Sequence, residues 1–248
     1  MPEESIPVRD NSKLFVPAAI VIGAAIIGIC LIIGLSHGTA GSGQAAGAAT
    51  AAAVNIKDVK TAGDPYIGSA NAPVVMAYWS DYQCPFCKAF EVGGVQGITQ
   101  PAVMPTLIKN YVDKGKLQIV FKDFPFLGND STTGAEYEHA IWELYPTQFY
   151  AWRTAMFTAQ DAEGDKGFGN ATTIDQLITS KFPQMDDAKI KAAITANKAK
   201  YDAAIDADKT EGGAMGVSGT PGFITGTTFI GGFDALSAFT AAIDAQLK

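Results

Sequence analysis

The residues best suited to chemistry are Cys84 and Cys87, which enclose Pro85 and Phe86 in a Cys-Pro-Phe-Cys motif. If the motif opens a helix, both sulfurs lie on its first turn, close enough to form a small-ring disulfide. The first sulfur would lie at the helix N-terminus, where unpaired backbone N–H groups and the helix dipole stabilise a thiolate. Pro85 suits the first helical position, because an N–H there has no intrahelical partner. The motif therefore predicts thiol–disulfide exchange.

Two other readings of the motif are half of a zinc site and a pair of inert structural thiols. The chain has three cysteines and two histidines, without a second Cys-x-x-Cys or a Cys-x-x-His. A zinc centre would need carboxylates or a distant histidine, and a disulfide-stapled scaffold would need more cysteines. We therefore expect redox chemistry and no metal site.

Asp81 precedes the first motif cysteine by three residues. A carboxylate in that place could move protons to Cys87 or change the pKa values of the thiols. Alternatively, Asp81 is a residue of a strand end or turn. The sequence leaves these two roles open.

Two other groups of polar residues have side chains that can bind metals. They are Glu136, His139 and Glu143 in one segment, and Asp202, Asp206, Asp208 and Glu211 in another. The first group lacks the second motif of a di-metal carboxylate site, and the second lacks the glycine and ligand spacing of a calcium loop. We expect the first group on a solvated face or capped in the core, and the second on a solvated helix face.

Apolar patterns around the motif predict an α/β domain. Residues 74–79 and 117–121 are short, β-favouring apolar runs typical of buried strands. Helical spacing extends over about residues 131–211. Residues 223–225 and 228–230 then flank Gly226-Thr227, a pair suited to a hairpin turn, and an amphipathic helix covers 236–247.

Composition restricts the class of protein. The chain has 248 residues, of which 48% are apolar and 17% charged, so it can form a packed core and is not disordered throughout. Its length allows one domain of roughly 150–200 residues with an appendage. A net charge of −7 argues against a duplex nucleic-acid binder.

The appendage is N-terminal. Residues 14–35 contain no charge and would span about 33 Å as a helix, which predicts a transmembrane anchor. The run exceeds the apolar region of a signal peptide, although the Ala/Gly-rich residues after it leave cleavage open. Arg9 and Lys13 precede it and the next cation is Lys57, so residues 1–13 are expected in the cytoplasm and the rest outside. Residues 36–53 are expected to form a flexible linker to a domain of residues 54–248.

Three segments resemble the DsbA-type thioredoxin-fold oxidoreductases, especially the membrane-anchored group. They are residues 68–90 with the Cys-Pro-Phe-Cys motif, the Lys-Asp-Phe-Pro-Phe string at 122–126, and residues 217–232. The resemblance implies a thioredoxin fold with a helical insertion at about 131–211. It makes Cys84 the exposed nucleophile and Cys87 the buried resolving cysteine. It also makes Pro221 a cis-proline next to the motif, with Thr220 before it.

The chain departs from that pattern in two places. Gly222 follows the proline where relatives often carry Thr or Ala, which predicts a looser start of the next strand. No cysteine occurs near residues 136–143, so no second disulfide is implied.

The resemblance implies an extracytoplasmic enzyme that oxidises cysteine pairs of exported proteins. Its redox group would be the Cys84–Cys87 disulfide without another cofactor, and a quinone-linked membrane protein would re-oxidise it. A reductase or isomerase of the same fold remains an alternative, as does a redox-inactive holdase that binds peptides around Phe86 and Pro221. Phe86 cannot offer a thiolate the charge of a histidine, and Thr220 also occurs in reducing relatives. We therefore expect a moderate oxidant.

Overall fold

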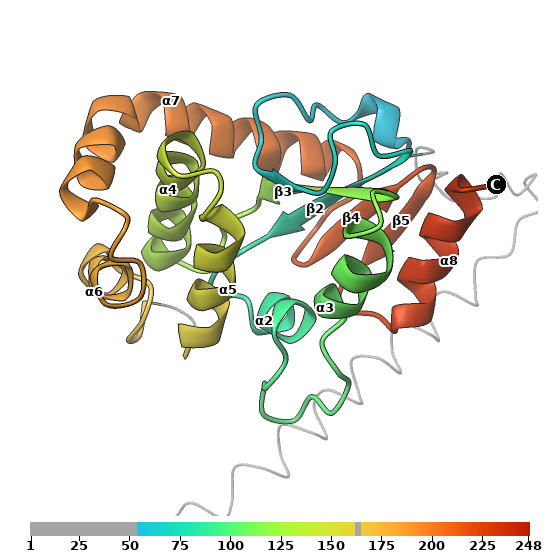
Figure 1. The fold of residues 1–248 in the computed structure, drawn as a ribbon, viewed down its shortest axis with the longest axis horizontal. Coiled ribbons are helices and arrows are strands. Elements are labelled where there is room, and N and C mark those ends of the chain that lie inside the picture. The colour runs from blue at the N-terminus through green and yellow to red at the C-terminus, as the bar shows by residue number, and fades with distance from the viewer. Residues whose placement is uncertain (1–53, 162–164) are drawn as a thin grey trace, which may run out of the picture. The chain divides into compact units, whose positions relative to one another are not determined.

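The computed structural model describes residues 54–161 and 165–248 (Figure 1). The expected cytoplasmic residues 1–13, membrane span 14–35 and linker 36–53 lie outside the described residues. Within the described part of the chain, no helix is both long enough and apolar enough to cross a bilayer.

The described residues form a mixed sheet of five strands in the order β1-β3-β2-β4-β5. Their bounds are Tyr66–Ile67 for β1, Val74–Ser80 for β2, Leu117–Asp123 for β3, Gly222–Thr225 for β4 and Thr228–Gly231 for β5. Strands β2 and β3 are parallel, whereas the other neighbouring pairs are antiparallel. The two buried strands and the hairpin are confirmed. The short edge strand β1 was not predicted, because a two-residue strand has no periodicity.

Helices cover both faces of the sheet (Figure 1). Their bounds are Pro85–Glu91 for α2, Met104–Leu107 for α3, Asn129–Leu144 for α4, Phe149–Ala159 for α5, Ala171–Lys181 for α6, Asp187–Ala214 for α7 and Leu236–Gln246 for α8. Two short elements are the 3-10 turn η1 (Ile56–Asp58) and the π-helical turn η2 (Ile108–Val112). The predicted helical segment between β3 and β4 thus contains α4, α5, α6 and α7. In Figure 1, α7 lies along the upper side of the sheet and α2, α3 and α8 along the lower side.

Strand β2 is buried on both faces because its alternate side chains enter two apolar layers. Tyr78 packs against Phe90 of α2 and stacks on Phe223 of β4, with ring centroids 5.1 and 4.6 Å apart. The next residue, Trp79, points the other way and donates its indole N–H to the Asp208 carbonyl of α7 at 3.0 Å. Gly212 permits this close packing, because a Cβ there would lie 2.7 Å from the indole nitrogen.

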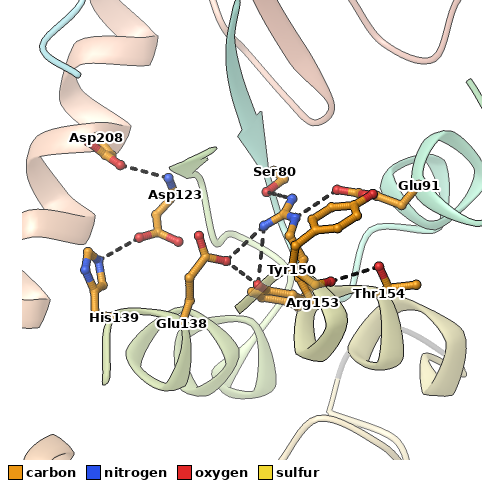
Figure 2. Close-up of polar contacts among 10 residues, drawn as sticks. Ser80, Glu91, Asp123, Glu138, His139, Tyr150, Arg153, Thr154 and Asp208 are labelled. Atoms are coloured by element: carbon orange, nitrogen blue, oxygen red, sulfur yellow. Dashed lines mark hydrogen bonds and ion pairs between the residues drawn. The ribbon is translucent and has the colours of Figure 1, made fainter. Parts of the chain in front are cut away.

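A buried arginine of α5 joins the sheet to helices α2 and α4 (Figure 2). The Arg153 guanidinium of α5 is inaccessible to solvent and donates hydrogen bonds to three side chains from other elements. These are Glu91 of α2 at 2.8 Å, Glu138 of α4 at 2.9 Å and Ser80 of β2 at 2.8 Å. Burial of a charge is costly unless it is paired and hydrogen-bonded, and here each partner comes from a different element.

A second polar network connects β3 with α4 and α7. His139 lies 2.8 Å from the Asp123 carboxylate, and Asp208 accepts the backbone N–H of Asp123 at 2.9 Å. Lys122 forms ion pairs with Asp208 at 2.5 Å and with Glu211 at 3.2 Å. The expectation of a solvated acidic face is therefore wrong for Asp208, which is buried because β3 places a lysine beneath α7.

Two carboxylates of the first candidate group pair with lysines of α7. Glu136 contacts Lys198 at 2.5 Å, and Glu143 pairs with Lys200. Throughout residues 54–161 and 165–248, no three His, Cys, Asp or Glu side chains are grouped as metal ligands.

Replacement of Arg153 by methionine keeps an unbranched chain of moderate volume but leaves Glu91 and Glu138 without their cation. We expect the free energy of unfolding to fall by about 3–5 kcal/mol, the usual cost of breaking a buried pair. Urea denaturation measures this loss. Lys198→Ala is the control, because that side chain is 57% exposed and its ion pairs should contribute less than about 1 kcal/mol. Equal losses in the two variants would contradict the structural importance of the buried network.

Candidate active site

The turn between β2 and α2 positions the two cysteines. Cys84 is the N-cap of α2 with an extended backbone, and Pro85 occupies the first turn of the helix. The Cys84 carbonyl accepts the first backbone hydrogen bond of the helix, from Lys88 at 3.1 Å. The sulfur of Cys84 therefore lies at a helix N-terminus, as predicted. Both cysteines are free thiols, so the structure represents the reduced pair.

The loop before β4 contacts this turn. The Thr220–Pro221 peptide is cis, and the Cys84 thiol donates a hydrogen bond to the Thr220 carbonyl at 3.3 Å. The prediction of a cis bond next to the motif is confirmed. The prediction of a loosened strand start is wrong: β4 begins at Gly222, which is paired with Trp79. A Cβ on Gly222 would lie 2.9 Å from a Val217 methyl, so glycine allows the loop to pack closely.

Both sulfur-bearing residues are almost fully covered. Cys84 is 3% exposed and Cys87 is 0% exposed. The resemblance implied an exposed Cys84, and this expectation is wrong for the reduced form, in which the Thr220 carbonyl lies against the thiol. The order of accessibility is nevertheless the one expected. Between the cysteines, Phe86 is 51% exposed.

The two thiols differ in acidity. The hydrogen bond with Cys87 lowers the pKa of Cys84 to about 7, against the opposing effect of burial. The backbone N–H groups of Phe86 and Cys87 also lower it. Burial raises the pKa of Cys87 well above its ordinary range, and the bond to Cys84 and its charge raise it further. Near neutral pH the pair therefore holds a reactive thiolate beside a protonated thiol.

The side chain of Asp81 serves the turn, because its carboxylate is hydrogen-bonded to backbone N–H groups. Its buried carboxylate accepts backbone N–H groups from Gln83 at 2.8 Å, Phe126 at 2.9 Å and Leu127 at 3.2 Å. Burial raises the pKa of Asp81, whereas these hydrogen bonds lower it. The contact that affects Cys87 is the backbone N–H of Asp81, which lowers the pKa of that thiol. Of the two roles left open, these contacts favour the turn residue.

Gln160, at the end of α5, is a site residue that the sequence did not reveal. Its side-chain amide donates to the carbonyls of Tyr82 at 2.7 Å and Cys84 at 3.1 Å. Lys88 of α2 in turn donates to the Gln160 carbonyl at 2.5 Å. The helical insertion thus holds the backbone of the cysteine turn. A single glutamine far along the chain carries no pattern that would have identified it.

The acidity difference predicts how the reduced protein reacts with iodoacetamide. The rate of Cys84 alkylation should rise with a midpoint near pH 7, because the thiolate is the nucleophile. In Cys87→Ala the midpoint should move upward, because the principal hydrogen bond to the Cys84 sulfur is lost. Mass spectrometry of samples quenched at successive pH values measures both profiles. Cys84→Ser is the control and should show no reaction with a midpoint near pH 7. A wild-type midpoint in the ordinary range of free thiols would contradict the assignment.

The chain is similar in sequence to proteins named for disulfide bond formation. It is 27% identical over 183 residues to the probable disulfide bond formation protein D of Bacillus anthracis, a match that covers 73% of this chain and 77% of that protein. It is 29% identical over 98 residues to the disulfide bond formation protein D of Bacillus subtilis, a match that covers 40% of each.

Solved structures share its fold. Oxidised BdbD from Bacillus subtilis superposes with a TM-score of 0.64 at 22% identity, over 76% of this chain and 95% of that one. The thiol-disulfide exchange protein alpha-DsbA2 from Wolbachia pipientis gives a TM-score of 0.62 at 23% identity, over 76% and 90%. The family model described as Thioredoxin matches residues 60–245. With its paired thiols at the strand-to-helix turn, the chain belongs to the thioredoxin family as a thiol:disulfide oxidoreductase.

Proposed function

We propose that this protein oxidises cysteine pairs of exported proteins outside the cytoplasm, using Cys84 and Cys87 as its redox-active disulfide. The observation that carries the proposal is the asymmetry of the pair. The pKa of Cys84 is lowered to about 7 beside the cis-proline loop, while the pKa of the fully buried Cys87 is raised. Such an arrangement gives one sulfur to the substrate and keeps the other within the protein.

In the proposed reaction, a substrate thiolate attacks the Cys84 sulfur of the disulfide. The substrate–Cys84 bond forms as the Cys84–Cys87 bond breaks, and Cys87 leaves with the electron pair and then takes up a proton. The second substrate thiol, as a thiolate, attacks the substrate sulfur of the mixed disulfide. Cys84 leaves as the stabilised thiolate. The substrate is oxidised by two electrons and the protein is reduced by two.

Features near the pair suit a peptide substrate. Phe86 and Phe126 are the two most exposed large apolar side chains of the described residues. The hydrogen bonds from Phe126 and Leu127 to Asp81 hold the segment after β3 against the cysteine turn. An extended peptide could add its backbone to Thr220 and place apolar side chains on this surface.

The acidity of Cys84 bears on the direction of electron flow. Stabilisation of its thiolate favours the reduced form and makes the disulfide more oxidising. A thiol pKa of about 3.5 accompanies the strong oxidant DsbA, and one of about 7 accompanies thioredoxin. The value of about 7 for Cys84 therefore favours a moderate oxidant over a strong one. The names of the Bacillus relatives favour oxidation over the alternative of a reductase or isomerase. Membership among the oxidoreductases argues against a redox-inactive holdase.

The proposal includes a place and a partner. Residues 14–35 would anchor the protein in the cell membrane with Arg9 and Lys13 on the cytoplasmic side. A quinone-linked membrane protein would re-oxidise the cysteine pair, so no cofactor beyond the disulfide is required. The net charge of −7 gives no support to a nucleic-acid partner.

Equilibration of the purified protein with glutathione buffers tests the direction. We expect a reduction potential between about −270 mV, as for thioredoxin, and about −120 mV, as for DsbA. Phe86→His should be more oxidising, because a cationic ring near the helix N-terminus would stabilise the Cys84 thiolate. Cys84→Ser is the control, since it cannot form the internal disulfide. A potential at or below that of thioredoxin would overturn the oxidase proposal in favour of a reductase.

Protease treatment of cells without an outer barrier tests the topology. Residues 54–248 should be digested from outside, because the cations that precede the span retain the N-terminus in the cytoplasm. An epitope placed before Met1 should survive on a short membrane-bound fragment. Immunoblots with and without detergent measure the two outcomes. Protection of the whole domain until detergent is added would reverse the proposed orientation.

A further inference from the structure

The buried hydroxyl of Tyr78 has no structural use in the reduced protein. Tyr78 is inaccessible to solvent, and its hydroxyl has no hydrogen-bond partner among the described residues. Leaving a buried donor unpaired is unfavourable, and such groups are uncommon in folded proteins. The neighbouring Arg153 guanidinium lies over the Tyr78 ring, 5.2 Å from its centroid, but is engaged by Glu91, Glu138 and Ser80 (Figure 2).

The fold places the Tyr78 ring against α2, the helix that carries the buried cysteine. Tyr78 packs against Phe90, which lies one turn after Cys87 on α2, and Cys87 and Phe90 are both inaccessible to solvent. Burial raises the pKa of Tyr78 above its ordinary range, and the charge of the Cys87 sulfur raises it further. Tyr78 therefore remains protonated and can act only as a donor toward a thiolate.

The chemistry of the pair requires such a donor. When the Cys84–Cys87 bond breaks, the electron pair leaves on the Cys87 sulfur, inside a core where a bare charge is poorly solvated. The backbone N–H of Asp81 lowers the pKa of Cys87. The Thr220 hydroxyl is also without a hydrogen-bond partner in the reduced form.

We propose that the Tyr78 hydroxyl donates a hydrogen bond to the Cys87 thiolate while it is the leaving group, and again when it attacks to re-form the disulfide. This inference rests on the proposed roles of the two cysteines. No proton needs to leave Tyr78: the hydroxyl stabilises the electron pair until the thiolate is protonated. Because the same transition state is used in both directions, Tyr78 should change the rate of exchange more than its equilibrium. Tyr78 is in this sense a catalytic residue, because its hydroxyl contacts a reacting sulfur.

Reduction of the oxidised full chain by dithiothreitol tests the inference. Tyr78→Phe removes only the hydroxyl, and we expect reduction to be slowed about three- to tenfold. The reverse reaction, formation of the Cys84–Cys87 disulfide with oxidised dithiothreitol, should slow by the same factor. Acid quenching followed by alkylation and mass spectrometry gives both rate constants. The glutathione potential should stay the same, a combination that a general disturbance of the core would not produce.

The following controls and outcomes decide the inference. Tyr137→Phe is the matched control, because its ring is buried but its hydroxyl bonds Asp175 of α6, and its rates should equal those of the wild type. The inference would be overturned if Tyr78→Phe were reduced and re-oxidised at wild-type rates. It would also be overturned if the glutathione potential shifted and the ratio of the reduction and oxidation rates changed. If dithiothreitol reduced the wild-type protein without the involvement of Cys84, that result would instead overturn the proposed function. Urea denaturation should show Tyr78→Phe at least as stable as wild type in the reduced form, because it loses an unpaired buried hydroxyl.

Discussion

Much of this structure depends on the burial of one guanidinium. Arg153 is paired with carboxylates from two other helices and with Ser80 at the end of β2 (Figure 2). None of these groups can lose its partner without leaving a charge or polar atom unpaired in the core. One carboxylate, Glu91, is the last residue of α2, the helix that begins beside Cys84. The ion network therefore holds the far end of the active-site helix against the helical insertion.

The insertion also contacts the near end of that helix. Gln160 donates to the carbonyls of Tyr82 and Cys84, and it lies seven residues beyond Arg153, directly after the end of α5. Helix α5 thus reaches both ends of α2, one through an ion pair and one through amide hydrogen bonds. The position of the cysteines relative to the cis-proline loop depends on this double attachment, because the thiol of Cys84 must meet the Thr220 carbonyl.

The chemistry of the site follows from unequal solvation of two neighbouring sulfurs. Burial raises the pKa of Cys87 and makes it a hydrogen-bond donor, and that donor in turn lowers the pKa of Cys84. The two shifts therefore have opposite signs and a shared cause. The depth of Cys87, set by the Tyr78 and Phe90 layer beneath α2, makes the pair useful for exchange. The same burial means that the negative charge formed on the Cys87 sulfur during exchange must be stabilised.

The sequence alone determined the features that depend on neighbours along the chain. These are the Cys-Pro-Phe-Cys motif at a strand-to-helix turn, the two buried strands and the hairpin. Spacing, apolar periodicity and turn residues record such local geometry directly. The place of Pro221 beside the motif came instead from the family resemblance. The short strand β1 and the π-helical turn were not predicted, because they are too short to show a periodic pattern of apolar residues.

Only the tertiary structure decided which polar groups meet in the interior. Arg153, Glu91 and Glu138 come from three helices, and no spacing relates them. The sequence placed Asp208 on a solvated acidic face, whereas the structure pairs it with Lys122 of β3. The sequence left two roles open for Asp81. The structure favours the turn role, because the carboxylate accepts the backbone N–H groups of Phe126 and Leu127. Charges and hydrogen bonds between distant residues leave no local pattern, because their energy depends on the partner and on the loss of water, and folding determines both.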